Sequence, residues 1–125
     1  MSTQIHTIYL VSEKAPGLAD FYRDALDLHV RFADADKWVQ MSDGKSSLAI
    51  AAPSEAPIGH ALPTLVFRST ELDALRDRIL SLGGAELEWR DMGTHGRVVT
   101  FRDPENNIFQ VLEPFDASGT DKAGA

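Results

Sequence analysis

The chain has 125 residues, of which 43% are apolar and 25% charged; these proportions are typical of a globular domain, and a chain of this length can bury a substantial core. Its formal net charge of −7 opposes binding to a phosphate backbone, so nucleic acid is not an expected partner. The absence of cysteine excludes disulfides, zinc–thiolate sites and thiol nucleophiles, and leaves His, carboxylates, hydroxyls or a metal with N and O ligands for any chemistry.

The first half of the chain predicts one strand, one helix and three further strands. Residues 5–11 are β-branched and aromatic enough for a strand. Ser12 can cap a helix that begins near Pro16, and apolar side chains between Leu18 and Leu26 recur at helical spacing. Three short strands are expected next, the last two joined by an Asp-Gly hairpin turn, at residues 29–32, 37–41 and 47–52.

The second half predicts the same order again. The stretch PSEAPIGHALP, residues 53–63, is broken by proline and glycine and reads as a linker. Thr70 with Asp73 can cap the second helix. The tail, residues 114–125, is small and polar, and we expect it to be flexible. The expected elements are strands at 64–68, 86–90, 97–102 and 108–113 and a helix at 71–82.

This repetition predicts an α+β fold of two tandem βαβββ modules that form a cupped mixed sheet with the helices on its outer face. Each helix stripe covers one sheet face, which leaves the opposite faces free to curl around a shared cavity. We expect a single domain over residues 1–113, with module one at 5–52, the linker at 53–63 and module two at 64–113.

The sequence also bears on location. It contains no apolar run long enough to span a bilayer, so no membrane partner is expected. Its first residues lack the basic region, apolar block and cleavage site of a secretory signal. A cytoplasmic location is therefore the expectation.

Several segments, taken in order, resemble the vicinal oxygen chelate superfamily, which contains glyoxalase I, the bleomycin resistance proteins and the extradiol dioxygenases. The resemblance runs from Ile5 to Glu113 and implies a homodimer with cavities between modules or subunits. Its enzymes hold a divalent metal with His and Glu side chains on cavity-facing strands, and the metal chelates neighbouring oxygens of the substrate. The segments that carry it are HTIYLVS from His6, FYRDAL from Phe21, ELDAL from Glu71 with Gly83-Gly84-Ala85, and FRDPENN from Phe101.

The resemblance implies four metal-ligand positions, and only one holds a ligand of the expected type. His6 occupies the first position, and Gln110 stands where the last strand normally offers glutamate. An ungapped reading places Thr64 at the first-strand position of the second module, or Pro63 if the reading slips by one residue. Residues 48–51 offer no ligand. Because an N- and O-ligated site generally needs three protein ligands, we expect no metal cofactor, with a divalent metal as the alternative.

The candidate ligand-binding residues each keep a structural alternative. Gln110 can hydrogen bond to an organic ligand, be a satisfied core amide, or ligate a metal. His6 can contact a ligand, ligate a metal, or pack against a neighbour. Arg68 can pair with a carboxylate or an anionic ligand, and Arg97 can lie at the cavity mouth or in solvent. Trp38 and Trp89 can stack on a planar ligand or pack in the core or a dimer interface. The predicted binding set is His6, Trp38, Thr64, Arg68, Arg97 and Gln110.

These residues support three functions. The first is a metal-free dimeric binding protein of the glyoxalase/bleomycin-resistance type that sequesters a partly aromatic small molecule in an apolar cup. The alternative is a divalent-metal-dependent lyase, isomerase or dioxygenase, in which His6 joins His60 or another side chain at a metal. A third is metal-independent acid–base catalysis by His6, with Gln110 orienting the substrate. Whether the chain is an enzyme stays open at this point.

Overall fold

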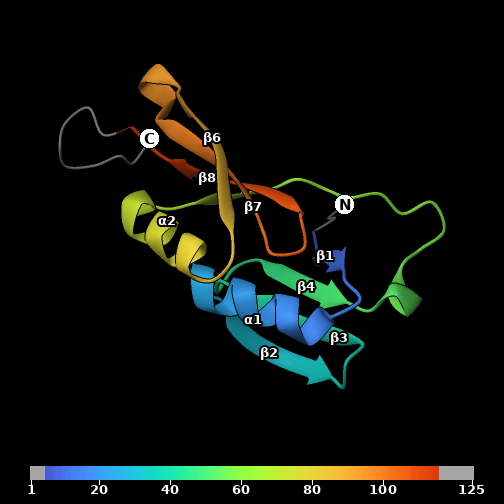
Figure 1. Ribbon diagram of the computed structural model, residues 1–125. Coiled ribbons are helices and arrows are strands. Elements are labelled where there is room, and N and C mark those ends of the chain that lie inside the picture. Colours follow the sequence, from blue (N-terminus) through green and yellow to red (C-terminus); the bar gives the residue numbers. More distant parts are fainter. Residues whose placement is uncertain (1–4, 116–125) are drawn as a thin grey trace, which may run out of the picture. The chain divides into compact units, whose positions relative to one another are not determined.

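The computed structural model describes residues 5–115, and its contacts divide the chain between Pro63 and Thr64 into two compact units. Each unit repeats the order strand, helix, three strands (Figure 1). The first module contains β1 (Ile8–Val11), α1 (Ala15–Leu26), β2 (His29–Asp34), β3 (Trp38–Ser42) and β4 (Ser47–Ala51). The second contains β5 (Leu65–Arg68), α2 (Leu72–Ser81), β6 (Ala85–Asp91), β7 (Arg97–Arg102) and β8 (Ile108–Glu113). The predicted α+β class with two βαβββ modules is confirmed.

In the first module the sheet order is β1-β4-β3-β2, with β1 parallel to β4 and the other pairs antiparallel. The helix α1 contacts β3 and β4 and covers one face of this sheet (Figure 1). Side chains alternate along a strand, so neighbours that share a register share a face. The covered face carries Leu10, Ile50 and Val39 in one row and Leu48 and Met41 in the next, all buried.

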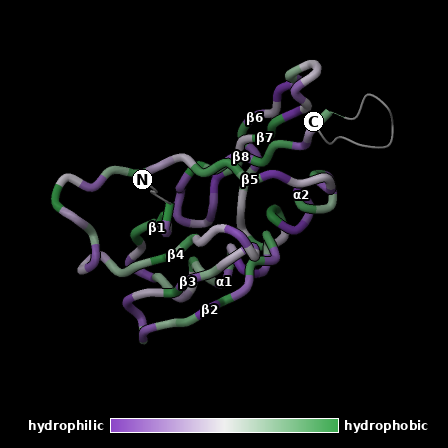
Figure 2. The backbone as a smooth tube through the Cα atoms, turned by 180° about the vertical axis from the view of Figure 1, so that it is seen from behind, coloured by the Kyte–Doolittle hydropathy of each residue, from purple (hydrophilic) through white to green (hydrophobic). Residues whose placement is uncertain are grey.

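The second sheet has the same topology, β5-β8-β7-β6, with β5 parallel to β8. Its covered face includes Phe109, Phe101 and Val111, all fully buried, and the rings of Phe109 and Phe101 stack with centroids 5.5 Å apart. Polar and apolar stretches alternate along α2 (Figure 2) because every third or fourth residue is apolar. The buried helix positions are Leu72, Leu75 and Ile79.

The two helix starts differ from the prediction. Ser12 does not cap α1; its Oγ accepts the N–H of Lys14, 2.9 Å away, in a local turn, and the helix begins without a side-chain cap. Thr70 does not cap α2 either. Instead Glu113, at the end of β8, accepts the Leu72 N–H through Oε2 at 3.1 Å. A cap from a distant strand cannot be recognised from a local sequence pattern, which is why the prediction failed there.

The remaining boundaries lie within three residues of those predicted. The first strand begins at Ile8, not at residue 5. The predicted linker, all of it described, contains a 3₁₀ turn at Pro53–Glu55 and otherwise irregular backbone. Of the predicted flexible tail, residues 116–125 lie outside the described part, whereas Pro114 is described and buried. None of the described helices is long and apolar enough to cross a membrane.

Candidate functional site

The uncovered face of the first sheet carries an aromatic cluster of Tyr9, Trp38 and Gln40. The two rings lie 4.8 Å apart between centroids, tilted by 51°. The Trp38 indole N–H donates to Oε1 of Gln40 at 3.0 Å, and the Tyr9 hydroxyl donates to the Glu55 carbonyl at 2.9 Å. All three side chains are half-buried. The cluster is therefore a fixed arrangement of ring faces and one amide, held at both ends by hydrogen bonds.

Small neighbours surround this cluster. The strand register sets Ala49 beside both Tyr9 and Gln40, and Ala51 beside Trp38. Both alanines are fully buried. Because alanine adds only a methyl group to the sheet surface, the larger rings stand above their neighbours on this face. Of these three residues, only Trp38 was predicted from the sequence as a ligand-binding residue. The spacing of two residues between Trp38 and Gln40, which puts both side chains on one face of the strand, was the signal that could have identified Gln40.

The uncovered face of the second sheet is less aromatic. Gln110 lies between Val66 and Thr100 in register, and its Nε2 donates to Thr100 Oγ1 at 3.1 Å. Within residues 5–115 no group donates a hydrogen bond to Oε1 of Gln110. Val66 is 59% exposed, and Arg68, two residues on, is exposed on the same face. Gln110 therefore presents an amide oxygen on a face where Val66 and Arg68 are exposed.

The two first-strand candidates, His6 and Thr64, are exposed and precede their strands. Ile8 lies opposite Leu48 in the first module, and Leu65 lies opposite Phe109 in the second. Aligning these parallel pairs matches His6 with Pro63, the alternative that differs by one residue from the ungapped reading.

Arg97 lies on the covered face of the second sheet, opposite to the face that carries Gln110 and Thr100. It belongs to an ion cluster of Asp73, Arg97 and Glu113. Its Nε donates to Glu113 Oε1 at 2.8 Å, and its Nη2 donates to Asp73 Oδ1 at 2.9 Å. Burial opposes the charge, but the hydrogen bonds to Glu113 and Asp73 prevail and raise the pKa of Arg97 above its usual value. The cluster joins β7, β8 and the first turn of α2.

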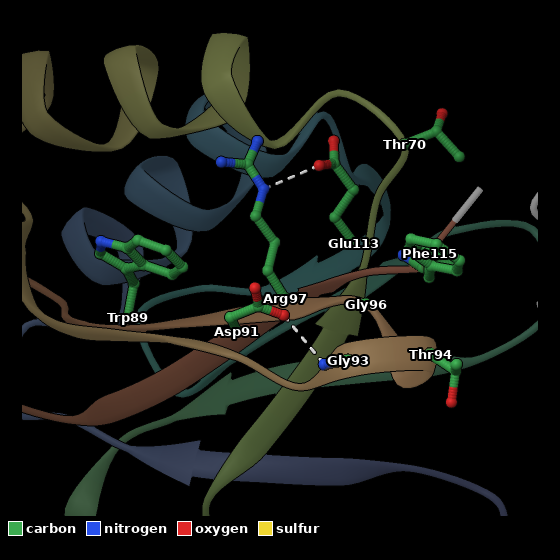
Figure 3. Close-up of a pocket in the computed structure, with 10 residues that line it drawn as sticks. Thr70, Trp89, Asp91, Gly93, Thr94, Gly96, Arg97, Glu113 and Phe115 are labelled. Atoms are coloured by element: carbon green, nitrogen blue, oxygen red, sulfur yellow. Dashed lines mark hydrogen bonds and ion pairs between the residues drawn. The ribbon is translucent and has the colours of Figure 1, made fainter. Parts of the chain in front are cut away.

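Next to the ion cluster is a pocket of about 690 Å³, within the size range of small-molecule sites. Figure 3 shows Trp89, Asp91 and Arg97 projecting from the β6–β7 hairpin toward α2, with Phe115 on the opposite side of the pocket. Gly96 forms part of its floor with φ near +100°, and a Cβ there would come within 2.0 Å of the Glu113 carbonyl. The lining residues are Thr70, Trp89, Asp91, Gly93, Thr94, Gly96, Arg97, Glu113, Pro114 and Phe115.

The residues present do not fit the divalent metal that the superfamily implies. Within residues 5–115 there is no group of three or more His, Asp or Glu side chains that could hold a metal ion. Gln110 takes the place of the implied carboxylate in the second module, and its register equivalent in the first is Ala49. His60 and His95 are both exposed, in the linker and in the β6–β7 turn.

Comparison with known proteins places the chain in a family. The profile of the glyoxalase-like domain family matches residues 7–112. No curated protein matches the sequence. Among solved structures, a lactoylglutathione lyase from Agrobacterium tumefaciens is similar with a TM-score of 0.74 and 21% identity, over 90% of this chain and 94% of that chain.

Two further structures share the fold. A glyoxalase/bleomycin resistance protein/dioxygenase family enzyme from Burkholderia phytofirmans PsJN has a TM-score of 0.74 and 14% identity, over 87% of this chain and 97% of its own. The genomically encoded fosfomycin resistance protein FosX from Listeria monocytogenes has a TM-score of 0.71 and 17% identity, over 92% and 96%. Because the profile matches residues 7–112, well over half of the chain, the chain belongs to the glyoxalase-like domain family of the vicinal oxygen chelate superfamily.

Proposed function

We propose that this chain is a small-molecule-binding protein that holds a partly aromatic ligand on its uncovered sheet faces without a protein-bound metal. The aromatic cluster of the first module is the observation that supports it. In the proposed form the protein is a homodimer, and each chain is a single domain of two modules, as the superfamily resemblance implies. The cytoplasmic location predicted from the sequence also belongs to this proposal. The predicted binding residues His6, Trp38, Thr64, Arg68 and Gln110 belong to this proposal.

The cluster has the properties of a stacking platform. The Trp38 indole is held by Gln40 through its N–H and by Tyr9 through its ring, so a ligand does not have to order it on binding. Offset or tilted aromatic contacts contribute about 0.5–1.5 kcal/mol beyond the area they bury. Since Oε1 of Gln40 accepts the indole N–H, its Nε2 is directed away from that bond and can donate to a ligand.

The uncovered face of the second module carries a polar group of its own. Gln110 donates to Thr100 and so directs its Oε1 toward other donors. A neutral amide suits the polar edge of an organic ligand better than it suits a cation, because it brings no compensating charge. This chemistry favours binding over the alternative, a metal-dependent lyase, isomerase or dioxygenase, although similar structures include a lyase and a resistance protein.

The test uses a Trp89→Phe chain, in which Trp38 is the only tryptophan. Metal-depleted protein in EDTA is titrated with planar probes of each charge, namely quercetin, acriflavine and 2-naphthoate, by calorimetry and Trp38 fluorescence. We expect saturable binding of at least one probe, weakened about tenfold by Gln40→Leu if it binds the face of the first module, or by Gln110→Leu if it binds the face of the second. Lys45→Gln, in the exposed β3–β4 turn, is the matched surface control and should bind as the parent does.

If no probe binds until a transition metal is added, the binding proposal is wrong. Elemental analysis of freshly purified protein then tests the metal-dependent enzyme alternative. A near-stoichiometric transition metal that is lost in His6→Ala would establish the enzyme alternative in its place.

A further inference from the structure

The pocket of the second module lies on the opposite side of the sheet from the proposed ligand face. Asp91, Arg97 and Glu113 lie in one row across β6, β7 and β8, on the face that α2 covers. Gln110 and Thr100 lie on the other face of the same strands. The pocket therefore belongs to a different surface from the uncovered face, and a ligand bound in it would be independent of the proposed function.

Arg97 does not make this pocket a site for anions. Two of its guanidinium nitrogens are bonded to the carboxylates of Glu113 and Asp73. One positive charge is thus matched by two negative charges within hydrogen-bond distance. An incoming carboxylate or phosphate would meet this negative excess and would have to displace a partner that is already bonded.

Trp89 and Asp91 offer the opposite chemistry. They lie two residues apart on β6, and because side chains alternate along a strand, both project into the pocket from the same face (Figure 3). Trp89 is 57% exposed, and tryptophan has the best ring face for a cation. One carboxylate oxygen of Asp91, Oδ1, accepts the Gly93 N–H at 2.9 Å, which fixes the group at the pocket wall. The second carboxylate oxygen can face the positive charge of a ligand.

The remaining lining fits the rest of such a ligand. Phe115 is 43% exposed and contributes an apolar surface on the other side of the pocket. The whole chain carries a formal charge of −7, which favours the approach of cations. A pocket of about 690 Å³ is far larger than a metal ion needs and suits an organic molecule.

We propose that this pocket binds an organic ammonium cation, with the charged head between the Trp89 ring and the Asp91 carboxylate and an apolar group toward Phe115.

The experiment uses a Trp38→Phe chain, in which Trp89 is the only tryptophan. Benzyltrimethylammonium chloride is titrated against Trp89 fluorescence, with benzyl alcohol as the neutral probe and benzoate as the anion. We expect saturable quenching by the ammonium probe alone, and weaker binding as salt is added. Asp91→Asn should weaken binding about tenfold, while its amide oxygen can still accept the Gly93 N–H and keep the turn. Asp43→Asn, in the exposed β3–β4 turn, is the matched control and should leave binding unchanged.

A second variant guards against a local folding defect in Asp91→Asn. Trp89→Leu in the Trp38→Phe chain should abolish binding of the probe by calorimetry, with an unchanged far-UV circular dichroism spectrum. The proposal is overturned if the probe gives no saturable signal, if Asp91→Asn binds it as tightly as the parent, or if benzoate binds as well as the ammonium. None of these outcomes bears on the uncovered faces, so the two proposals succeed or fail separately.

Discussion

The two modules place an aspartate at the same point of their last hairpin, but at very different depths. In the first module Asp43 follows β3, is exposed, and accepts the N–H groups of Lys45 and Ser46 through Oδ1. These bonds lower the pKa of Asp43. In the second module Asp103 follows β7 and is only 2% exposed. The same residue type therefore serves as a surface turn in one module and as a buried polar centre in the other.

The depth changes what the aspartate must do. Both oxygens of Asp103 are used: Oδ1 accepts the N–H groups of Glu105 and Asn107, and Oδ2 accepts the side-chain amide of Asn107. The backbone of Glu105 is partly accessible to water, but the two Asn107 donors are buried and would have no other partner. The comparison indicates that the contribution of a turn residue to the free energy of unfolding depends on its burial and not on the turn type.

The sharpest way to test this comparison is to truncate both aspartates. Asp103→Ala leaves buried donors without partners and should lower the free energy of unfolding by about 2–4 kcal/mol. Asp43→Ala should cost less than about 1 kcal/mol, because water replaces its carboxylate. Urea unfolding followed by Trp89 in a Trp38→Phe chain measures the second module, and Trp38 in a Trp89→Phe chain measures the first.

The conservative variant separates the hydrogen bonds from the charge. Asp103→Asn keeps one carbonyl oxygen and should retain more than half of the stability that Asp103→Ala loses. Equal losses from Asp103→Ala and Asp43→Ala would show that burial does not distinguish the two turns.

A second difference between the modules is the attachment of the helix. The first turn of α2 is bonded to β8 by Glu113, which also holds Arg97, whereas α1 starts without a side-chain cap. Glu113→Ala removes the cap of Leu72 and the partner of Arg97, and should cost about 1–2 kcal/mol in the unfolding of the second module.

Glu113→Gln divides that loss. Its amide oxygen can still accept the Leu72 N–H, but the charge that pairs with Arg97 is gone, so we expect a cost of about 0.5–1 kcal/mol. Added salt should reduce the difference between the parent and Glu113→Gln, because it screens the ion pair. If Glu113→Gln is as unstable as Glu113→Ala, the cap contributes nothing.

Much of the fold could be predicted because hydrophobic periodicity, turn residues and the repeat agree in both halves. The first strand is shorter than predicted for a reason that lies outside its own residues. Its ladder to β4 begins at Ile8 opposite Leu48, and residues 5–7 have β-forming composition without a paired strand. A strand's limits are set by its partner, which local composition does not report.

The candidate sites were harder to predict because they depend on register. Gln40 shares a face with Trp38 by simple alternation, and that signal was available. The capping role of Glu113 could not be predicted in this way, because the N–H that it accepts belongs to Leu72, 41 residues earlier in the chain. The glutamine also lies on a different strand in each sheet. In the first sheet Gln40 is on β3 and pairs with Ala49, whereas in the second Gln110 is on β8 and pairs with Thr100. An alignment of the two halves alone conceals this difference.

A third difference between the modules concerns the helix ends. In each module the residue two positions before the next strand has a left-handed backbone: Asp27 with φ 59° in the first and Gly83 with φ 101° in the second. Glycine adopts this conformation without a Cβ penalty and aspartate does not. Asp27→Gly should therefore stabilise the first module by about 0.5–1 kcal/mol, and Gly83→Ala should destabilise the second by about 1 kcal/mol.

Each exchange has its own control. Asp27→Ala removes the carboxylate but keeps the Cβ, so it should bring none of the gain expected for Asp27→Gly. At position 83 a new Cβ would lie 3.4 Å from Pro104 Cγ, an ordinary contact, so the cost of Gly83→Ala reports the backbone and not a clash. A gain from Asp27→Ala equal to that from Asp27→Gly would assign the effect to the charge at the end of α1, and the two helix ends would then differ in electrostatics, not in backbone strain.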